Sequence, residues 1–213
     1  MPRNGSNGAP TRGARRKART RAALIEGARA VFARQGVDAT AIAEITEAAD
    51  VGFGSFYNHF ATKEEIAEAV LTEVIAEQGA AVERLTAKLD DPAEVVSVAH
   101  RYFVRRARSD PDWARVLIRL DVSHRVASAA LGAHARRDLE RGIKAGRFEV
   151  GDRGVAFWSA GGALLAVMRG VLDGELRSGA DVHHAENVLR MLGLPAAEAA
   201  EVARRPLPTM AVD

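Results

Sequence analysis

Apolar residues recur every three to four positions along most of the chain, a spacing that predicts helices and not strands. One helix is expected from residue 22 to 35, where Gly36 is placed to stop it. Beyond residue 60, the same period with intervening proline and glycine predicts further helices at 64–89, 92–108, 112–121, 123–145, 152–177 and 182–193. A tail at 195–213 has room for one short helix, and the expected fold class is all-α.

Residues 40–60, TAIAEITEAADVGFGSFYNHF, predict two short helices separated by a tight turn. Thr40 is expected to cap the first helix through its hydroxyl oxygen. The turn falls at Asp50-Val51-Gly52, where Gly52 is expected to adopt a backbone angle that other residues avoid. Two short helices joined in this way can place the second helix in the major groove of DNA, so a helix-turn-helix is predicted.

Positive charge is concentrated at the start of the chain. The net charge is +2, but the first 21 residues contain seven Arg or Lys and no acidic residue, so the remainder is net negative. Residues 1–13, rich in glycine and polar residues, are expected to form a disordered basic arm. Its place beside the helix-turn-helix favours contact with DNA phosphates or the minor groove over a purely solubilising tail.

From about residue 20 to 66 the chain resembles the N-terminal DNA-binding domain of the tetracycline-repressor (TetR) family. The matching segments are ARAVFARQG at 28–36, T at 40 with IAEI at 42–45, AADV at 48–51, GSFYNHF at 54–60 and KE at 63–64. Three positions depart from the family pattern. Gly52 replaces a usual Ser, Phe53 replaces a residue that is often polar or basic, and Asn58 replaces one that is often basic.

The resemblance implies a DNA-binding domain at 14–65 and a helical ligand-binding and dimerisation domain at 66–194. We expect Phe53, Ser55 and Asn58 to face base edges, with Phe53 able to press against a thymine methyl group. Phe56 and Phe60 should pack the core of the small domain. Phosphate contacts are expected, by resemblance, from Thr40, Tyr57, His59 and Lys63, with support from Arg15, Arg16, Lys17 and Arg19 of the arm.

The C-terminal part carries candidate effector and dimer residues. An effector cavity is expected to be lined by residues drawn from Tyr102, Phe103, Trp113, Leu117, His124, Trp158, Leu165 and Met168, with His100 as a possible polar contact. Each of these residue types is more often ordinary packing than a cavity wall. In TetR-like proteins the last two long helices pair with a second subunit, which assigns dimerisation to Gly161, Gly162, Val188, Leu189 and Leu192, although an intramolecular core is the alternative.

Several classes of function are not expected. The chain has no cysteine, which rules out disulfides and thiolate metal sites, and its six histidines show no His-x3-His spacing, so no metal site is predicted. Neither a nucleophile-elbow motif nor a phosphate-binding loop is present, so no enzyme activity and no cofactor are expected. No apolar run approaches the ~20 residues that span a bilayer, and a cytoplasmic location is predicted.

The sequence therefore predicts a homodimeric transcription regulator, most simply a repressor that binds a palindromic operator and responds to a small molecule. One alternative is a ligand-binding dimer whose helix-turn-helix no longer binds DNA. Another is a regulator that requires a co-repressor.

Overall fold

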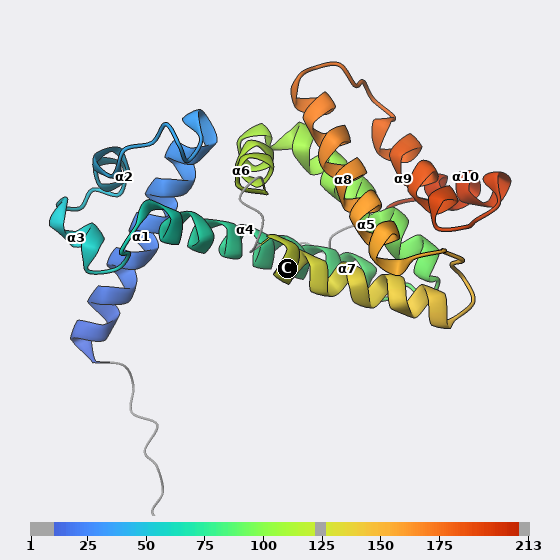
Figure 1. Cartoon of the computed structure of the whole chain (residues 1–213), viewed down its shortest axis with the longest axis horizontal. Coiled ribbons are helices and arrows are strands. Elements are labelled where there is room, and N and C mark those ends of the chain that lie inside the picture. The colour runs from blue at the N-terminus through green and yellow to red at the C-terminus, as the bar shows by residue number, and fades with distance from the viewer. Residues whose placement is uncertain (1–10, 122–126, 209–213) are drawn as a thin grey trace, which may run out of the picture. The chain divides into compact units, whose positions relative to one another are not determined.

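The computed structural model describes residues 11–121 and 127–208, and their side chains except at 119–131. Every regular element in those residues is a helix, so the all-α class is confirmed (Figure 1). The helices are α1 (Arg12–Gln35), α2 (Ile42–Ala48), α3 (Gly54–Tyr57), α4 (Lys63–Thr86), α5 (Pro92–Ser109), α6 (Pro111–Asp121), α7 (Ala127–Lys144), α8 (Arg153–Leu172), α9 (Ala180–Met191) and α10 (Ala196–Arg204).

The chain divides into two compact units, Met1–Val70 and Leu71–Asp213, and the boundary falls inside α4. In the first unit, α1 packs against α2, and α2 contacts α3. Gly27 is the point of closest approach between α1 and the end of α2. A Cβ atom at Gly27 would lie only 2.9 Å from the backbone nitrogen of Ala49 and 2.9 Å from the carbonyl oxygen of Ile45. Phe56 and Phe60 are buried in this unit, as expected.

Helix α1 begins about ten residues earlier than the sequence pattern indicated. Thr11 caps it, its Oγ1 accepting a hydrogen bond from the Ala14 N–H at 3.2 Å. Alanine and arginine favour helix once such a cap is in place, and the segment is rich in both. The basic residues Arg15, Arg16, Lys17 and Arg19, expected to support DNA binding beside the disordered arm of 1–13, therefore lie exposed on a helix. The remainder of the predicted arm, residues 1–10, lies outside the described chain.

Two expectations about the helix-turn-helix are wrong in detail. Thr40 does not cap α2: the N-cap is Ala41, and the buried Thr40 hydroxyl donates to the Gly36 carbonyl at 2.5 Å. The left-handed residue of the turn is Asp50, with φ of 52°, and not Gly52. Aspartate tolerates this conformation better than most residues, and the Val51 N–H then bonds to the Thr46 carbonyl at 3.0 Å to close the helix end.

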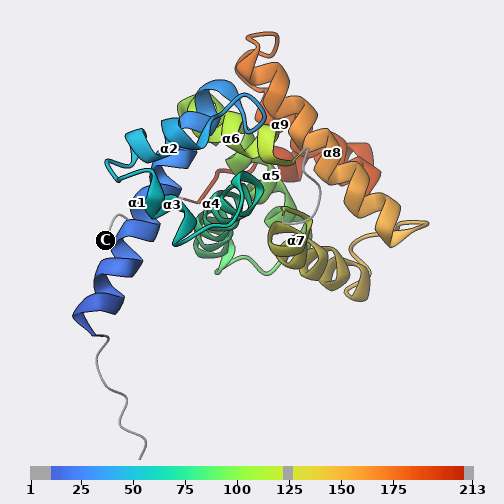
Figure 2. The ribbon, with the colours of Figure 1, turned by 60° about the vertical axis from the view of Figure 1, so that its left-hand side comes forward.

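In the second unit α5 contacts α6, α7, α8, α9 and α10, and so lies at its centre (Figure 2). Helix α8 ends at Leu172, earlier than expected, because Gly174 adopts a left-handed φ of 75°. The segment from 195 contains the one short helix for which the sequence left room, α10, which packs on α5 and α9 and buries Ala199, Val202 and Ala203. Arg205, just after α10, also pairs with Glu94 at 3.0 Å.

Helix α8 is apolar but mostly exposed. Only Ala156 and Met168 are buried along it, whereas Val155 is 65% exposed and Trp158 is 59% exposed. With a mean hydropathy of 1.6, this helix is long and apolar enough to cross a membrane by length and composition alone. The expectation that the chain has no apolar run of that length is therefore corrected. A helix packed in a water-soluble bundle meets the same criterion, and α8 contacts α5, α6, α7 and α9. Its exposed apolar face is an available contact surface.

Candidate nucleic-acid interface and ligand cavity

Two aromatic side chains are exposed side by side at α3. Phe53 and Tyr57 are each 54% exposed, and their rings meet edge to face with centroids 5.8 Å apart. The neighbouring Phe56 is fully buried and contacts Tyr57 from inside the domain, with ring centroids 5.4 Å apart. The core thus supports an aromatic pair that it does not cover, which is typical of a contact surface.

Beside this pair lies a polar hollow of about 420 Å³. It is lined by Gly13, Arg16, Lys17 and Thr20 from α1, and by Ser55, Asn58 and His59 from α3 and the turn that follows it. The structure therefore brings together five residues that the sequence assigned to DNA from two separate segments. Two cationic side chains beside short hydrogen-bonding groups suit a phosphate backbone.

His59 is half-buried and contributes one buried polar atom to this hollow. Its Nδ1 atom is buried and has no hydrogen-bond partner in the part of the chain that the structure describes. Burial lowers the pKa of His59 below its usual value, and the nearby charges of Lys17 and Arg21 lower it further. A phosphate in the hollow would supply a negative partner for an imidazole that otherwise has none.

Thr40 and Lys63 have structural partners instead. The Lys63 ammonium donates to the carbonyl oxygens of Asp38 and Thr40, both at 3.0 Å, and so ties α4 to the loop before α2. Because the Thr40 side chain is buried and bonded to Gly36, we withdraw it from the expected phosphate contacts. Lys63 retains one N–H, so its predicted phosphate contact stays a prediction.

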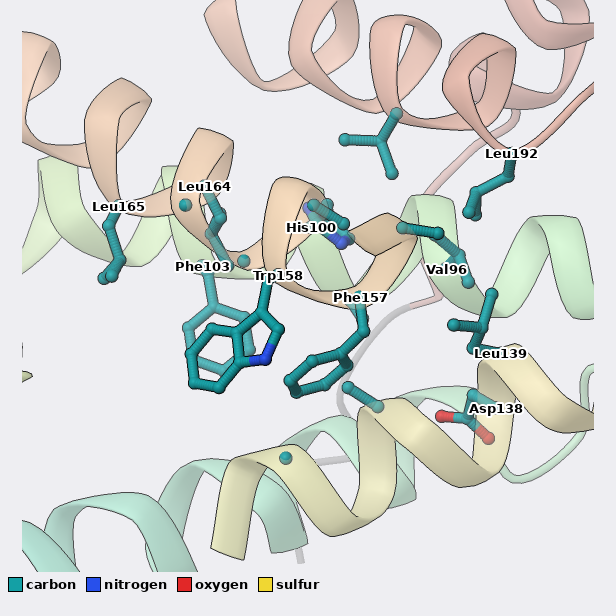
Figure 3. Close-up of a pocket in the computed structure, with 18 of the residues that line it drawn as sticks. Val96, His100, Phe103, Asp138, Leu139, Phe157, Trp158, Leu164, Leu165 and Leu192 are labelled. Atoms are coloured by element: carbon teal, nitrogen blue, oxygen red, sulfur yellow. The ribbon is translucent and has the colours of Figure 1, made fainter. Parts of the chain in front are cut away.

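A second, largely apolar cavity of about 340 Å³ lies within the C-terminal unit (Figure 3). Its walls come from α5, α6, α7, α8 and α9. Phe103, Leu117, Trp158 and Leu165 line it, as the sequence analysis proposed.

The other expected lining residues lie elsewhere. The Tyr102 hydroxyl donates to Gln78 at 2.8 Å, away from this cavity. Trp113 stands behind the wall, stacked on Phe103 with ring centroids 6.0 Å apart. Met168 is fully buried without lining the cavity, and His124 lies outside the described residues.

The residues assigned to dimerisation divide into two groups. Val188, Leu189 and Leu192 are buried inside the C-terminal unit, so the α9 part of that assignment is corrected in favour of an intramolecular core. Gly161 and Gly162 are exposed on α8 and also border the cavity. A helical apolar stripe has the same sequence pattern in both situations, which is why the sequence alone did not separate them.

Two ionisable side chains line the cavity, His100 from α5 and Asp138 from α7. The Nδ1 atom of His100 is 2.9 Å from the Nε2 atom of His184 on α9. Burial lowers the pKa of His100 to about 3 and that of His184 to about 4, so both rings are neutral near pH 7. Burial raises the pKa of Asp138. The sequence analysis did not identify Asp138, because its inward direction depends on the rotation of α7.

Two family models match this chain. Residues 24–70 match the bacterial regulatory proteins of the tetR family, and residues 91–205, more than half of the chain, match the tetracyclin repressor-like C-terminal domain. The chain belongs to the TetR family. The resemblance to this family of bacterial regulatory proteins that was noted in the sequence is thereby confirmed.

Among TetR proteins, the repressor DhaR of Mycobacterium sp. (strain GP1) is 44% identical over 54 residues, which is 25% of this chain and 27% of DhaR. The regulator TcmR of Streptomyces glaucescens is 35% identical over 94 residues, 44% of this chain and 41% of TcmR. The chain thus matches well under half the length of these curated relatives. The crystal structure of RolR with resorcinol is 40% identical with a TM-score of 0.76, covering 92% of this chain and 98% of RolR.

No group of three or more His, Cys, Asp or Glu side chains that could hold a metal ion occurs within residues 11–121 and 127–208.

Proposed function

We propose that this TetR-family chain is a ligand-responsive repressor that binds a palindromic operator as a homodimer in the cytoplasm. The observation that carries the proposal is a largely apolar cavity lined by residues of α5–α9 in a chain whose other unit presents a helix-turn-helix. Relatives named as repressors support the sign of regulation. The α4 helix is continuous across the boundary between the units and is the direct covalent route between them.

At the DNA, Phe53, Ser55 and Asn58 would face base edges in the major groove, while the exposed Tyr57 beside Phe53 would contact the phosphate backbone. Phe53 is too apolar to bond a base edge, but its exposed ring suits a thymine methyl group. Arg16 and Lys17 of α1 would neutralise phosphates beside the hollow. Extension of α1 to Arg12 gives these cations a rigid support.

A second copy of the chain would cover the exposed apolar face of α8. Val155 and Trp158 are large, apolar and mostly exposed on that helix, which is costly for a monomer in water. A twofold dimer would also present two reading helices to a palindrome.

A cavity of about 340 Å³ suits a small ring compound. The RolR structure, at 40% identity, contains resorcinol, which supports a small aromatic effector for this chain too. Binding would weaken operator affinity if the ligand preferred a conformation that does not fit DNA.

The proposal is tested by selecting bound sequences from a random duplex library at two salt concentrations. A palindrome should be enriched, with affinity falling steeply as salt rises. Arg16→Gln should reduce the salt slope by about one unit, whereas Arg190→Gln, an exposed arginine on α9, should leave it unchanged. A folded dimer that enriches no sequence would refute autonomous operator binding and favour the co-repressor or retired-domain alternatives.

A further inference from the structure

The polar groups of the C-terminal cavity indicate which effector it accepts. The lining contains no Lys or Arg among the described side chains, and its two ionisable groups are His100 and Asp138. Among the lining residues whose side chains the structure describes, an anionic effector would lose its hydration without meeting an ammonium or guanidinium group, because the nearby Arg136 guanidinium lies over the Phe157 ring. A carboxylate or phosphate ligand is disfavoured, and a neutral molecule is favoured.

Asp138 offers an unused hydrogen-bond acceptor. Its carboxyl group makes no hydrogen bond or ion pair with any other residue that the structure describes, although it is partly buried at the cavity wall. The neighbouring Arg137 is committed to Glu83 instead, at 3.1 Å. Asp138 is half-buried and partly desolvated, although the charges of Arg141 and Arg137 act on it, and a hydroxyl group of a ligand would supply a hydrogen bond that the described residues do not.

His100 offers a second polar atom to a ligand. Its pairing with His184 decides whether that atom donates or accepts a hydrogen bond. One hydrogen lies between His100 Nδ1 and His184 Nε2, which are 2.9 Å apart. If His184 supplies that hydrogen, neutral His100 carries its own on Nε2 and acts as a donor there. If His100 supplies it, Nε2 of His100 becomes an acceptor. His184 is only 4% exposed, so the pair is held in place by packing.

Aromatic side chains provide flat walls. Phe103, Phe157 and Trp158 all line the cavity (Figure 3). The Phe157 ring is fixed from the α7 side, where the Arg136 guanidinium lies 4.0 Å from its centroid. Its edge also lies 3.3 Å from where a Cβ of Gly132 would be. A ring held in this way, with two further aromatic side chains at the wall, favours a planar aromatic ligand by stacking or edge-to-face contact.

We propose that the cavity selects a neutral aromatic compound bearing hydroxyl groups, with Asp138 accepting from one hydroxyl and His100 bonding a second polar atom. His184 acts as a positioning residue that fixes the ring and tautomer of His100. This inference rests on the proposed function, since it names the effector class for the same cavity.

Binding of four probes to the purified full-length protein tests the selection. Resorcinol and phenol should bind, toluene should bind at least about tenfold more weakly than phenol, and benzoate should show no binding. Asp138→Leu should abolish most of the phenol-to-toluene preference. Asp173→Asn, which changes an exposed aspartate at the end of α8, is the matched control and should keep it.

The positioning role of His184 has its own readout. His184→Gln can keep a polar atom near His100 Nδ1 and should retain phenol affinity within about threefold. His184→Leu cannot, and should weaken phenol by about tenfold while leaving toluene unchanged. In the unaltered protein, the imidazole nitrogen NMR signals of His100 should shift on adding phenol but not on adding toluene.

Toluene binding as tightly as phenol, or absence of binding by every aromatic probe, would overturn the inference, and neither result depends on a variant folding. Benzoate binding as well as phenol would do the same. Operator affinity measured on the same preparations keeps the two claims separate. Operator binding without hydroxyl selectivity refutes only the effector class, whereas hydroxyl selectivity without operator binding refutes only the repressor function.

Discussion

The contact between α1 and α2 at Gly27 gives a sharp test of how the DNA-binding unit is held together. A Cβ there would lie 2.9 Å from the Ala49 nitrogen, 2.9 Å from the Ile45 carbonyl oxygen and 3.1 Å from the Ala49 Cβ. Two of these three atoms belong to the backbone, so a side chain cannot be accommodated by a rotamer change. Gly27→Ala must move the helices apart.

The expected cost follows from two opposing effects. Overpacking a close contact costs about 1–3 kcal/mol, while replacing a helical glycine with alanine returns up to about 1 kcal/mol. Because two of the three contacts are with backbone atoms that cannot yield, the overpacking cost should lie in the upper part of its range, at about 2–3 kcal/mol, and Gly27→Ala should destabilise the unit by about 1–2 kcal/mol after a gain of about 1 kcal/mol in helix propensity. Gly13→Ala lies in the same helix with nothing within 4 Å of the added atom, so it should be neutral or stabilising by up to about 1 kcal/mol.

Hydrogen exchange of backbone amides at residues 24–33, measured on the full chain, reports the opening free energy of this unit locally. Protection should fall in Gly27→Ala and hold or rise in Gly13→Ala. Operator affinity should fall together with protection in Gly27→Ala. Equal protection in the two variants would refute the view that the close approach at Gly27 sets the packing of the helix-turn-helix.

Three further predictions concern the loop anchor, the base contact and the buried histidines. Lys63→Met removes the hydrogen bonds to two loop carbonyls and should lower the unfolding free energy, measured in urea, by about 1–3 kcal/mol. An unchanged stability together with a weaker salt dependence of operator affinity would instead make Lys63 a phosphate contact without a structural role. Phe53→Ala should weaken operator binding by roughly tenfold. Replacing thymine with uracil in the operator, which removes the methyl group, should weaken binding of the unaltered protein but not of Phe53→Ala. If the two changes weaken binding additively, Phe53 does not contact the methyl group. Because the folded protein keeps His100 and His184 neutral down to about pH 3 and 4 while the unfolded chain protonates them near 6.5, stability should fall as the pH drops from 6.5 to 4. Each histidine should contribute about 1.4 kcal/mol per pH unit to the slope of the unfolding free energy against pH. Urea unfolding of His184→Leu should therefore show a flatter pH dependence than that of the unaltered protein. An identical slope in the two proteins would contradict the neutral histidine pair.

The sequence predicted most helices because local signals decide them. Asp91 and Pro92 start α5 as expected, since an aspartate cap and a proline in the first turn act within a few residues. The start of α1 was missed for the opposite reason. Its first residues have the composition of a flexible basic arm, and only the Thr11 cap, a weak signal in sequence, shows that the helix extends to Arg12.

The sites were harder to predict because they depend on which way a side chain faces. Phe103 and Trp113 are both aromatic at helical positions, yet one lines the cavity and the other packs behind it. Val188 has the pattern of a dimer seam but completes the core of its own subunit. Asp138 is one of several charged residues of α7, and its position at the cavity wall follows from tertiary packing that periodicity does not encode.

The most direct test of the central claim is the operator affinity of the full chain with and without saturating resorcinol, measured by fluorescence anisotropy on the selected palindrome. Ligand-responsive repression predicts that operator affinity falls by at least about tenfold and that resorcinol affinity falls by the same factor when operator is bound, because the coupling is reciprocal. Operator affinity that stays constant while calorimetry shows resorcinol bound to the protein would contradict it.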